Sequence, residues 1–245
     1  MNSAITVDDL TYFYPDGTQA LKSVSLEISA GESISLMGPN GAGKTTLFLH
    51  LNGLITGNSG IVKVFGTSMD GKKSMREIRQ RVGIVFQNPE DQLFCPTVFD
   101  DVAFGPLNYG FPPEEVRDRV RDALKAVGMS EYGDRVPHHL SFGEKKRISL
   151  ATILSIRPDI ILLDEPTSNL DPRARRKVIE VIRSLKVTKV IATHDLEMAL
   201  ELCERGIILD SGSVVADGPI LRILKDKSLL EAHGLEVPYS LRQTI

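Results

Sequence analysis

A glycine-rich segment at residues 38–45, GPNGAGKT, has the composition and spacing of a phosphate-binding loop. Its three glycines permit the tight turns in which successive backbone N–H groups point at phosphate oxygens. Lys44 would place a cation near the β- and γ-phosphates, and Thr45 would offer its hydroxyl to Mg²⁺. A helix is expected to follow the loop and to direct its positive end at the same phosphates. The segment therefore predicts binding of a nucleoside triphosphate together with Mg²⁺.

Two carboxylates follow the apolar run at residues 160–163, which is typical of a buried strand. Asp164 and Glu165 would then lie at the carboxyl edge of a sheet, where α/β proteins form their sites. Asp164 would hold Mg²⁺ through water, and Glu165 would accept a proton from the attacking water. Alternatively, the pair only caps the helix that follows Pro166. The phosphate loop earlier in the chain favours the catalytic interpretation.

A second candidate anion site lies at residues 140–147, LSFGEKKR. Ser141 is a favourable N-cap for the helix that the apolar pattern predicts from this point. Its hydroxyl, the Gly143 amide and the positive end of the helix would together attract a phosphate. A capped helix start on its own is weak evidence for a ligand. Whether this segment binds an anion must therefore be judged together with the other motifs of the chain.

The elements that must position these groups follow an α/β order. Alternating residues predict strands in the first third, and a short apolar strand runs directly into the phosphate loop. A mostly helical segment, about residues 88–158, comes next, and β/α alternation then resumes. The order predicts a mixed sheet flanked by helices and interrupted by a helical insertion. Short amphipathic helices are expected in the tail, for which the residues suggest no chemistry.

These motifs, together with DEPTSNLD and IATHD, resemble in order and separation the ATP-binding subunits of ABC transporters, over nearly the whole chain. The resemblance implies an ABC-type phosphate-loop ATPase core with an N-terminal antiparallel β subdomain. It also implies a helical subdomain, about residues 88–158, between the phosphate loop and the acidic strand. The ATP-binding domain would cover residues 1–225, and residues 226–245 would form a short helical tail.

The resemblance also explains the second anion site. In this family two copies bind head to tail with two ATP molecules between them, so Ser141 and Gly143 would complete the ATP site of the other subunit. The implied partners are a second ABC ATPase subunit, identical or closely related, and integral membrane transporter subunits, but no nucleic acid. The implied reaction is ATP hydrolysis, with Mg²⁺ held by Thr45, Gln87 and Asp164.

Further site residues are implied by the same resemblance. Gln87 would sense Mg²⁺ and water while its loop meets the membrane subunit, and His194 would bond the γ-phosphate. Ser168 and Asp171 would link the two sites across the dimer, although Asp171 also suits the N-cap of the next helix. The catalytic residues would be Glu165, His194 and Gln87.

The nucleotide is expected to contact an aromatic side chain as well as the phosphate loop. By the same resemblance, Tyr14 would stack on adenine, a contact worth about 1–3 kcal/mol, and Tyr12 and Phe13 are close enough to be alternatives. The remaining expected contacts are the loop and the residue after it: Gly38, Pro39, Asn40, Gly41, Ala42, Gly43, Lys44, Thr45 and Thr46.

The signature segment departs from the family's commonest form, L-S-G-G-Q, at two positions. Phe142 stands at the first glycine and Glu144 at the glutamine. Ser141 and Gly143, which would offer the phosphate contacts, are present. We therefore expect the anion site to persist, with a less free turn at Phe142.

Bulk properties fit this assignment. The chain has 245 residues and a net charge of −3, so no strong field attracts nucleic acid or anionic lipid.

Cys95 and Cys203 are expected to be reduced and structural. Neither a signal peptide nor a membrane span is expected, so the place at the cytoplasmic face of the membrane that the resemblance implies would be peripheral, through the membrane partners. His138 and His139 are expected to be surface or packing residues rather than a metal site, and the basic run at 173–177 predicts a solvated helix face.

Within the family, FQNPEDQLF, HHLSFGEKKR and the tail LLEAHGLEVPYSL most resemble the ATPases of energy-coupling-factor importers, in particular the cobalt/nickel type called CbiO. The expected cargo is therefore cobalt or nickel ions, with a vitamin-type importer as the alternative. A soluble ABC ATPase acting on DNA or ribosomes is a second class, but the chain has neither a long coiled-coil insertion nor two cassettes. A phosphate-loop kinase or GTPase would leave residues 140–147 and His194 unexplained.

Overall fold

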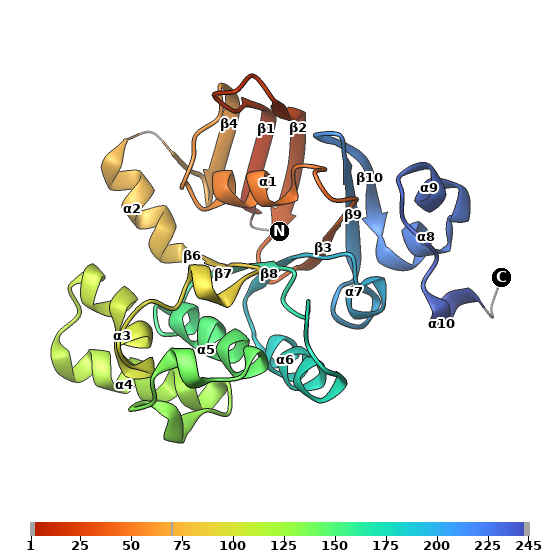
Figure 1. Cartoon of the computed structure of the whole chain (residues 1–245). Coiled ribbons are helices and arrows are strands. Elements are labelled where there is room, and N and C mark those ends of the chain that lie inside the picture. The colour runs from red at the N-terminus through yellow and green to blue at the C-terminus, as the bar shows by residue number, and fades with distance from the viewer. Residues whose placement is uncertain (1–2, 70, 243–245) are drawn as a thin grey trace.

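Two β-sheets organise the computed structural model, which describes residues 3–69 and 71–242. An antiparallel sheet has the order β2-β1-β4-β5, and a six-stranded sheet has the order β10-β9-β3-β8-β7-β6. Figure 1 shows the first sheet above the second, with α1 between them. The strands are β1 (Ser3–Phe13), β2 (Gln19–Ser29), β3 (Ser33–Met37), β4 (Ser59–Val64), β5 (Thr67–Ser68), β6 (Val82–Val85), β7 (Ile160–Asp164), β8 (Thr188–Ala192), β9 (Arg205–Asp210) and β10 (Ser213–Pro219).

The six-stranded sheet brings the chemical motifs to one edge. Its strands β9, β3, β8, β7 and β6 pair in parallel, and β10 pairs antiparallel with β9. Because parallel strands end at the same edge, the segments after β3, β6, β7 and β8 lie together there. These are the phosphate loop and the segments that begin near Gln87, Asp164 and His194.

Alternation along β7 builds a core on each face of this sheet. Ile160 and Leu162 pack with the antiparallel sheet and with α1, whereas Ile161 and Leu163 pack against the helices on the opposite face. All five residues of β7 are buried, as expected for a strand covered on both faces. The strand end that carries Asp164 is therefore held rigidly from both sides.

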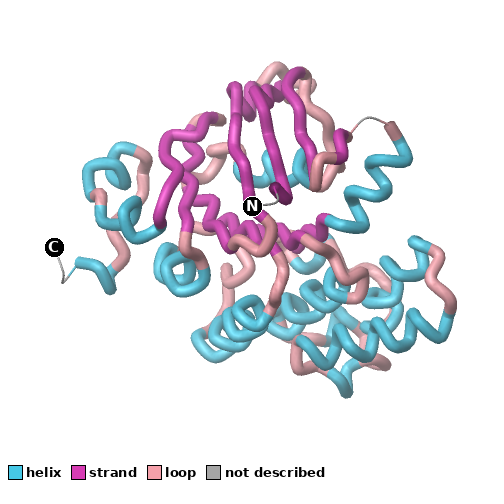
Figure 2. Tube along the Cα trace, turned by 180° about the vertical axis from the view of Figure 1, so that it is seen from behind, coloured by secondary structure: helices cyan, strands magenta, loops and turns pink. Residues whose placement is uncertain are grey.

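The helices divide by face (Figure 1), and the reverse view shows α3 to α7 gathered below the six-stranded sheet (Figure 2). They are α1 (Lys44–Leu51), α2 (Lys72–Arg81), α3 (Val98–Tyr109), α4 (Pro113–Ala126), α5 (Phe142–Leu154), α6 (Pro172–Ser184), α7 (Leu196–Leu202), α8 (Ile220–Lys225), α9 (Lys227–Ala232) and α10 (Tyr239–Arg242). None of them is long and apolar enough to cross a bilayer, as far as the described residues show.

The predicted fold class is confirmed: an antiparallel β subdomain, a mixed sheet flanked by helices, and helices inserted between the phosphate loop and the acidic strand. Two details differ. Helix α2 was not predicted from the sequence: Met75 and Ile78 are its only apolar residues, and Ile78 is its one buried residue among the side chains described. The chain between α4 and α5 was expected to be mostly helical, but it contains only two short 3₁₀ turns, at Ser130–Tyr132 and Pro137–His139. Two glycines and a proline interrupt it.

Candidate functional site

The phosphate loop joins β3 to α1, and its backbone requires glycine at two positions. Gly38 has φ 143°, and a Cβ there would lie 1.9 Å from the carbonyl oxygen of Leu209. Gly43, with φ 104°, caps α1, and a Cβ there would lie 2.6 Å from the carbonyl oxygen of Ala20. The loop is therefore packed tightly against neighbouring backbone in a conformation that side chains rarely adopt.

Lys44 lies within the loop that it is expected to serve. Its Nζ donates hydrogen bonds to the carbonyl oxygens of Gly38 (2.6 Å) and Pro39 (2.9 Å). Burial lowers the pKa of Lys44, and the charges of Glu165 and Asp164 oppose that shift. The ammonium is thus held at the start of α1, where the positive end of the helix also favours an anion.

Of the three candidate adenine partners, Tyr14 is attached to the phosphate-loop helix. Its hydroxyl is hydrogen-bonded to that of Thr46, at 2.9 Å, in the first turn of α1. Tyr12 meets the Tyr14 ring edge-on at 5.0 Å and the His50 ring edge-on at 4.7 Å. Phe13 is exposed, and its backbone N–H donates to Asn58. The geometry favours Tyr14 among the three, with Tyr12 as its support.

Thr45 and Asp164 meet although 119 residues separate them. The Thr45 hydroxyl donates to Asp164 Oδ2 at 2.7 Å. Burial raises the pKa of Asp164, whereas the hydrogen bond from Thr45 lowers it. A hydroxyl and a carboxylate are the hard oxygen donors that Mg²⁺ prefers. The pair therefore fits the metal role predicted for it.

The Glu165 carboxylate is buried and lies against the end of β8. Its Oε2 accepts a hydrogen bond from the Thr193 hydroxyl at 3.1 Å, and its Oε1 accepts one from the His194 backbone N–H at 3.0 Å. His194 Nδ1 lies 2.8 Å from the same Oε1, while 66% of its side chain remains exposed. The structure thus brings the predicted pair together and adds Thr193, which precedes His194 at the end of β8.

The Glu165 backbone has φ 44°, in the left-handed region. For a residue other than glycine this conformation costs about 1–3 kcal/mol and persists only where the surroundings hold it. Its N–H donates to the Ala192 carbonyl at 2.9 Å, and its carbonyl accepts from the Ser168 hydroxyl, also at 2.9 Å. Ser168, predicted as a contact across the dimer, therefore also has a local role.

Lys146 is a buried neighbour of this site that the sequence did not single out. Its Nζ donates to the carbonyl oxygens of Gln87 (2.5 Å) and Glu165 (3.0 Å). Burial lowers the pKa of Lys146 to about 8, with Asp164 and Glu165 opposing the shift. Lys146 lies in a run of three basic residues, a pattern typical of a solvated surface, so nothing in the sequence indicated its burial. The Gln87 side chain itself is exposed beyond the end of β6.

The start of α5 differs from a simple capped helix. Ser141 donates from its backbone N–H (2.9 Å) and its hydroxyl (2.7 Å) to the Glu144 carboxylate, which also accepts from the Tyr132 hydroxyl at 2.7 Å. Hydrogen bonds from Ser141 and Tyr132 lower the pKa of Glu144. Glu144, one of the two departures from the common signature, thus holds Ser141 in place.

The other departure, Phe142, is the first residue of α5, so no turn requires glycine at this position. The expectation of a less free turn therefore does not apply. Gly143 is needed for a different reason: a Cβ there would lie 2.7 Å from the Ala174 Cβ of α6. Asp171 caps α6 by accepting from the backbone N–H groups of Arg173 (2.8 Å) and Ala174 (3.0 Å). These hydrogen bonds lower the pKa of Asp171.

The two residue groups considered in the sequence as a possible metal site and a possible basic patch have partners within the chain. His138 Nδ1 lies 3.8 Å from Glu90, and no group of three potential His, Cys, Asp or Glu ligands occurs in the part of the chain described. Arg175, from the basic run, pairs with Asp195 at 2.8 Å. Both cysteines are free thiols; burial raises the pKa of Cys95 to about 11 and that of Cys203 to about 12.

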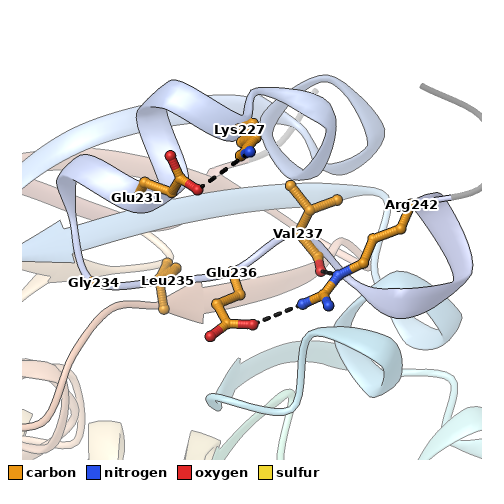
Figure 3. Close-up of a pocket in the computed structure, with 7 residues that line it drawn as sticks. All are labelled: Lys227, Glu231, Gly234, Leu235, Glu236, Val237 and Arg242. Carbon is orange, nitrogen blue, oxygen red and sulfur yellow. Dashed lines mark hydrogen bonds and ion pairs between the residues drawn. The ribbon is translucent and has the colours of Figure 1, made fainter.

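A cavity of about 790 Å³ lies in the tail (Figure 3), and a Cβ on its lining residue Gly234 would lie 3.9 Å from the Pro39 Cβ of the phosphate loop. Its charged side chains pair with one another: Lys227 with Glu231 at 3.6 Å, and Arg242 with Glu236 at 2.7 Å. Because these charges are paired with one another, they do not indicate an ionic ligand in the cavity. The tail also contacts the core through His233, whose Nδ1 lies 2.7 Å from Asp210, a contact that the sequence did not predict.

Comparisons with known proteins agree on one family. The model of the ABC transporter family matches residues 21–168. The energy-coupling factor transporter ATP-binding protein EcfA of Methanothermobacter thermautotrophicus is 48% identical, over 96% of this chain and 76% of its own length. The structure of cbiO1 from Clostridium perfringens, part of the ABC transporter complex cbiONQ, has a TM-score of 0.83 and 35% identity over 95% of this chain and 94% of its own.

A third similarity shows the cassette with reaction products. The dimeric structure of an ATP-binding cassette in a post-hydrolysis state, bound to ADP and Pi, has a TM-score of 0.79. It is 30% identical to this chain, and the match covers 88% of this chain and 98% of that one.

Proposed function

The chain belongs to the ABC transporter family and is an ATP-hydrolysing transporter subunit of the EcfA and CbiO kind; from this we propose that it drives an importer by closing and opening a dimer around two ATP molecules. The observation that carries the proposal is the meeting of Thr45, Asp164, Glu165 and His194 at one sheet edge. The domain would span residues 1–225, with residues 226–245 as its tail.

We propose that the nucleotide lies along the phosphate loop, with adenine on Tyr14. The backbone N–H groups of residues 40–46 and the Lys44 ammonium would bind the phosphates, because both are positioned at the start of α1. Thr45 and Asp164 would hold Mg²⁺, with Gln87 as the third proposed ligand after β6. When bound, the ion supplies positive charge against the β- and γ-phosphate oxygens.

Glu165 is the proposed general base. A carboxylate has roughly four acceptor sites, and the Thr193 hydroxyl and the His194 N–H occupy two of them. These bonds orient the carboxylate and leave acceptor capacity for the proton of an attacking water. His194, which is mostly exposed, would bond the γ-phosphate as the nucleotide binds.

The second copy would complete each site. Ser141 and Gly143 lie at the start of α5, whose positive end would meet the γ-phosphate of the partner's ATP. The Ser141 hydroxyl donates to Glu144 in the single chain, so closure would transfer that donor to the nucleotide. Asp171 and Ser168 would lie between the two sites. The partner is either an identical chain or a close relative.

A groove between the core and the inserted helices is the proposed docking surface for a membrane subunit. A cavity of about 390 Å³ there is lined by Phe94 and Phe104, whose rings meet edge-on at 5.0 Å and are exposed. Asp101 lies in the same groove, with Oδ2 buried and without a hydrogen-bond partner among the described residues. An apolar segment of the partner would complement the two exposed rings.

Replacing Phe94 with aspartate is expected to reduce recovery of the membrane subunits by about tenfold or more, because Phe94 is 61% exposed and would anchor the partner. The measurement is affinity purification of the tagged chain from detergent-solubilised membranes, with the bound integral membrane proteins quantified. Val215→Asp, on the exposed edge of β10, is the control and should retain them. Equal recovery with both variants would contradict the proposed surface.

We further propose that the subunit lies peripherally on the cytoplasmic face of the membrane, through these partners, and that the cargo is cobalt or nickel ions. The similarity to cbiO1 and EcfA supports this class of importer, and a vitamin is the alternative cargo. Reconstituting the chain with its co-purified membrane proteins and measuring ATP-dependent uptake of ⁵⁷Co²⁺, ⁶³Ni²⁺ and labelled vitamins would distinguish them.

A further inference from the structure

Lys146 ties together three parts of the molecule that are distant in sequence. It lies in the first half of α5, only 1% of it is exposed, and its Nζ donates to the carbonyl oxygens of Gln87 at 2.5 Å and Glu165 at 3.0 Å. A buried ammonium is unfavourable unless its donors are satisfied, and here two backbone carbonyls accept from two of its three N–H groups. The Phe142 ring lies one turn earlier, with its centroid 5.9 Å from Nζ.

The two carbonyls belong to the segments that the proposed mechanism requires to be correctly placed. Gln87 follows β6, and Glu165 follows β7, its neighbour in the sheet. The Glu165 backbone is in the left-handed conformation, with φ 44°, and therefore depends on its surroundings. Lys146 holds the carbonyl of that same residue, from a helix whose first turn contains Ser141.

We propose that Lys146 is a positioning residue for ATP hydrolysis, which fixes the Glu165 backbone and the Gln87 loop relative to the start of α5. The Lys146 ammonium donates to two backbone carbonyls and touches none of the residues predicted to bind the nucleotide. It would therefore affect hydrolysis through Glu165 and Gln87. This inference rests on the proposed role of Glu165 as general base. It predicts that loss of Lys146 lowers kcat far more than ATP binding.

Lys146→Met, which keeps an unbranched side chain, one bond shorter, and removes the donors, tests the proposal. We expect kcat to fall by about 10- to 100-fold, because displacement of a catalytic group by about 1 Å has effects of this size. The ATP Kd, measured by calorimetric titration of the same protein, should change by less than about threefold, since the phosphate loop is untouched.

Lys189→Met is the matched control for stability. Lys189 is also buried, 8% exposed, and its Nζ donates to the carbonyls of Leu185 (3.0 Å) and Ile182 (3.4 Å) at the end of α6. Thermal unfolding should show similar losses of stability in the two variants, while Lys189→Met keeps its kcat. A Lys146→Met protein with normal kcat would overturn the proposal, and so would an equal loss of kcat in both variants.

Lys146→Gln provides the test if the methionine variant does not fold. Its side chain is one bond shorter and cannot reach both carbonyls, so kcat should fall by about 3- to 10-fold at unchanged Kd; an unchanged kcat would overturn the proposal. Glu165→Gln is measured alongside. If that variant hydrolyses ATP normally, the proposed role of Glu165 fails, whereas normal hydrolysis in the Lys146 variants alone rejects only this inference.

Discussion

Glu165→Gln is expected to lower the rate of ATP hydrolysis by about 10²–10⁴-fold, the usual contribution of a positioned proton acceptor. The amide has nearly the same shape as the carboxylate, and its oxygen can still accept the hydrogen bond that the His194 N–H donates to Glu165. It cannot accept a proton from water. ATP should therefore still bind, and the dimer closed around it should accumulate because hydrolysis no longer opens it.

Single-turnover hydrolysis and size-exclusion chromatography with MgATP measure both effects. Glu201→Gln is the control, since Glu201 lies on α7 and pairs with Arg183 on α6 rather than with the site. Its hydrolysis should match that of the unsubstituted chain. If Glu165→Gln turned over within about threefold of normal, Glu165 would not be the proton acceptor.

Lys44→Ala is expected to weaken ATP binding by about 10- to 150-fold, because a hydrogen bond to a charged group contributes about 1.5–3 kcal/mol. Lys44 is held inside the loop by the Gly38 and Pro39 carbonyls, so no other side chain can replace its charge there. The loss should be larger for ATP than for AMP, since the ammonium is predicted to reach the β- and γ-phosphates.

Calorimetric titration with ATP and AMP tests this difference between the two nucleotides. Lys63→Ala, an exposed lysine on β4, is the control and should bind both nucleotides normally. Equal losses of ATP and AMP affinity in Lys44→Ala would point to a collapsed loop, and unchanged ATP affinity would contradict the assignment of the loop.

The sequence predicted those features whose residue types follow directly from local chemistry. The phosphate loop requires its glycines because its backbone is left-handed and packs closely against neighbouring chain. Strand β7 requires apolar residues because it is buried on both faces. The meeting of Thr45 with Asp164 follows from these, because parallel strands end at one edge. The phosphate loop and the acidic strand end thus form one site because their strands lie in the same parallel sheet.

The features that the sequence did not predict depend on tertiary packing. A lysine can be exposed or buried, and only the surrounding chain decides that Lys146 reaches two carbonyls. Thr193 has no distinguishing feature in the sequence. It reaches Glu165 only because β8 pairs with β7 in the folded sheet. Helix α2 has one buried residue among the side chains described, and its two apolar residues, Met75 and Ile78, are too few to predict a helix.

The dependence of hydrolysis on protein concentration tests the shared site most directly. Since Ser141 and Gly143 are proposed to act on the partner's nucleotide, the hydrolysis rate per chain should rise with concentration. It should approach zero at dilutions where analytical ultracentrifugation with MgATP shows single copies. A rate per chain that stays constant down to those dilutions would show that one copy hydrolyses ATP alone, and it would contradict the account.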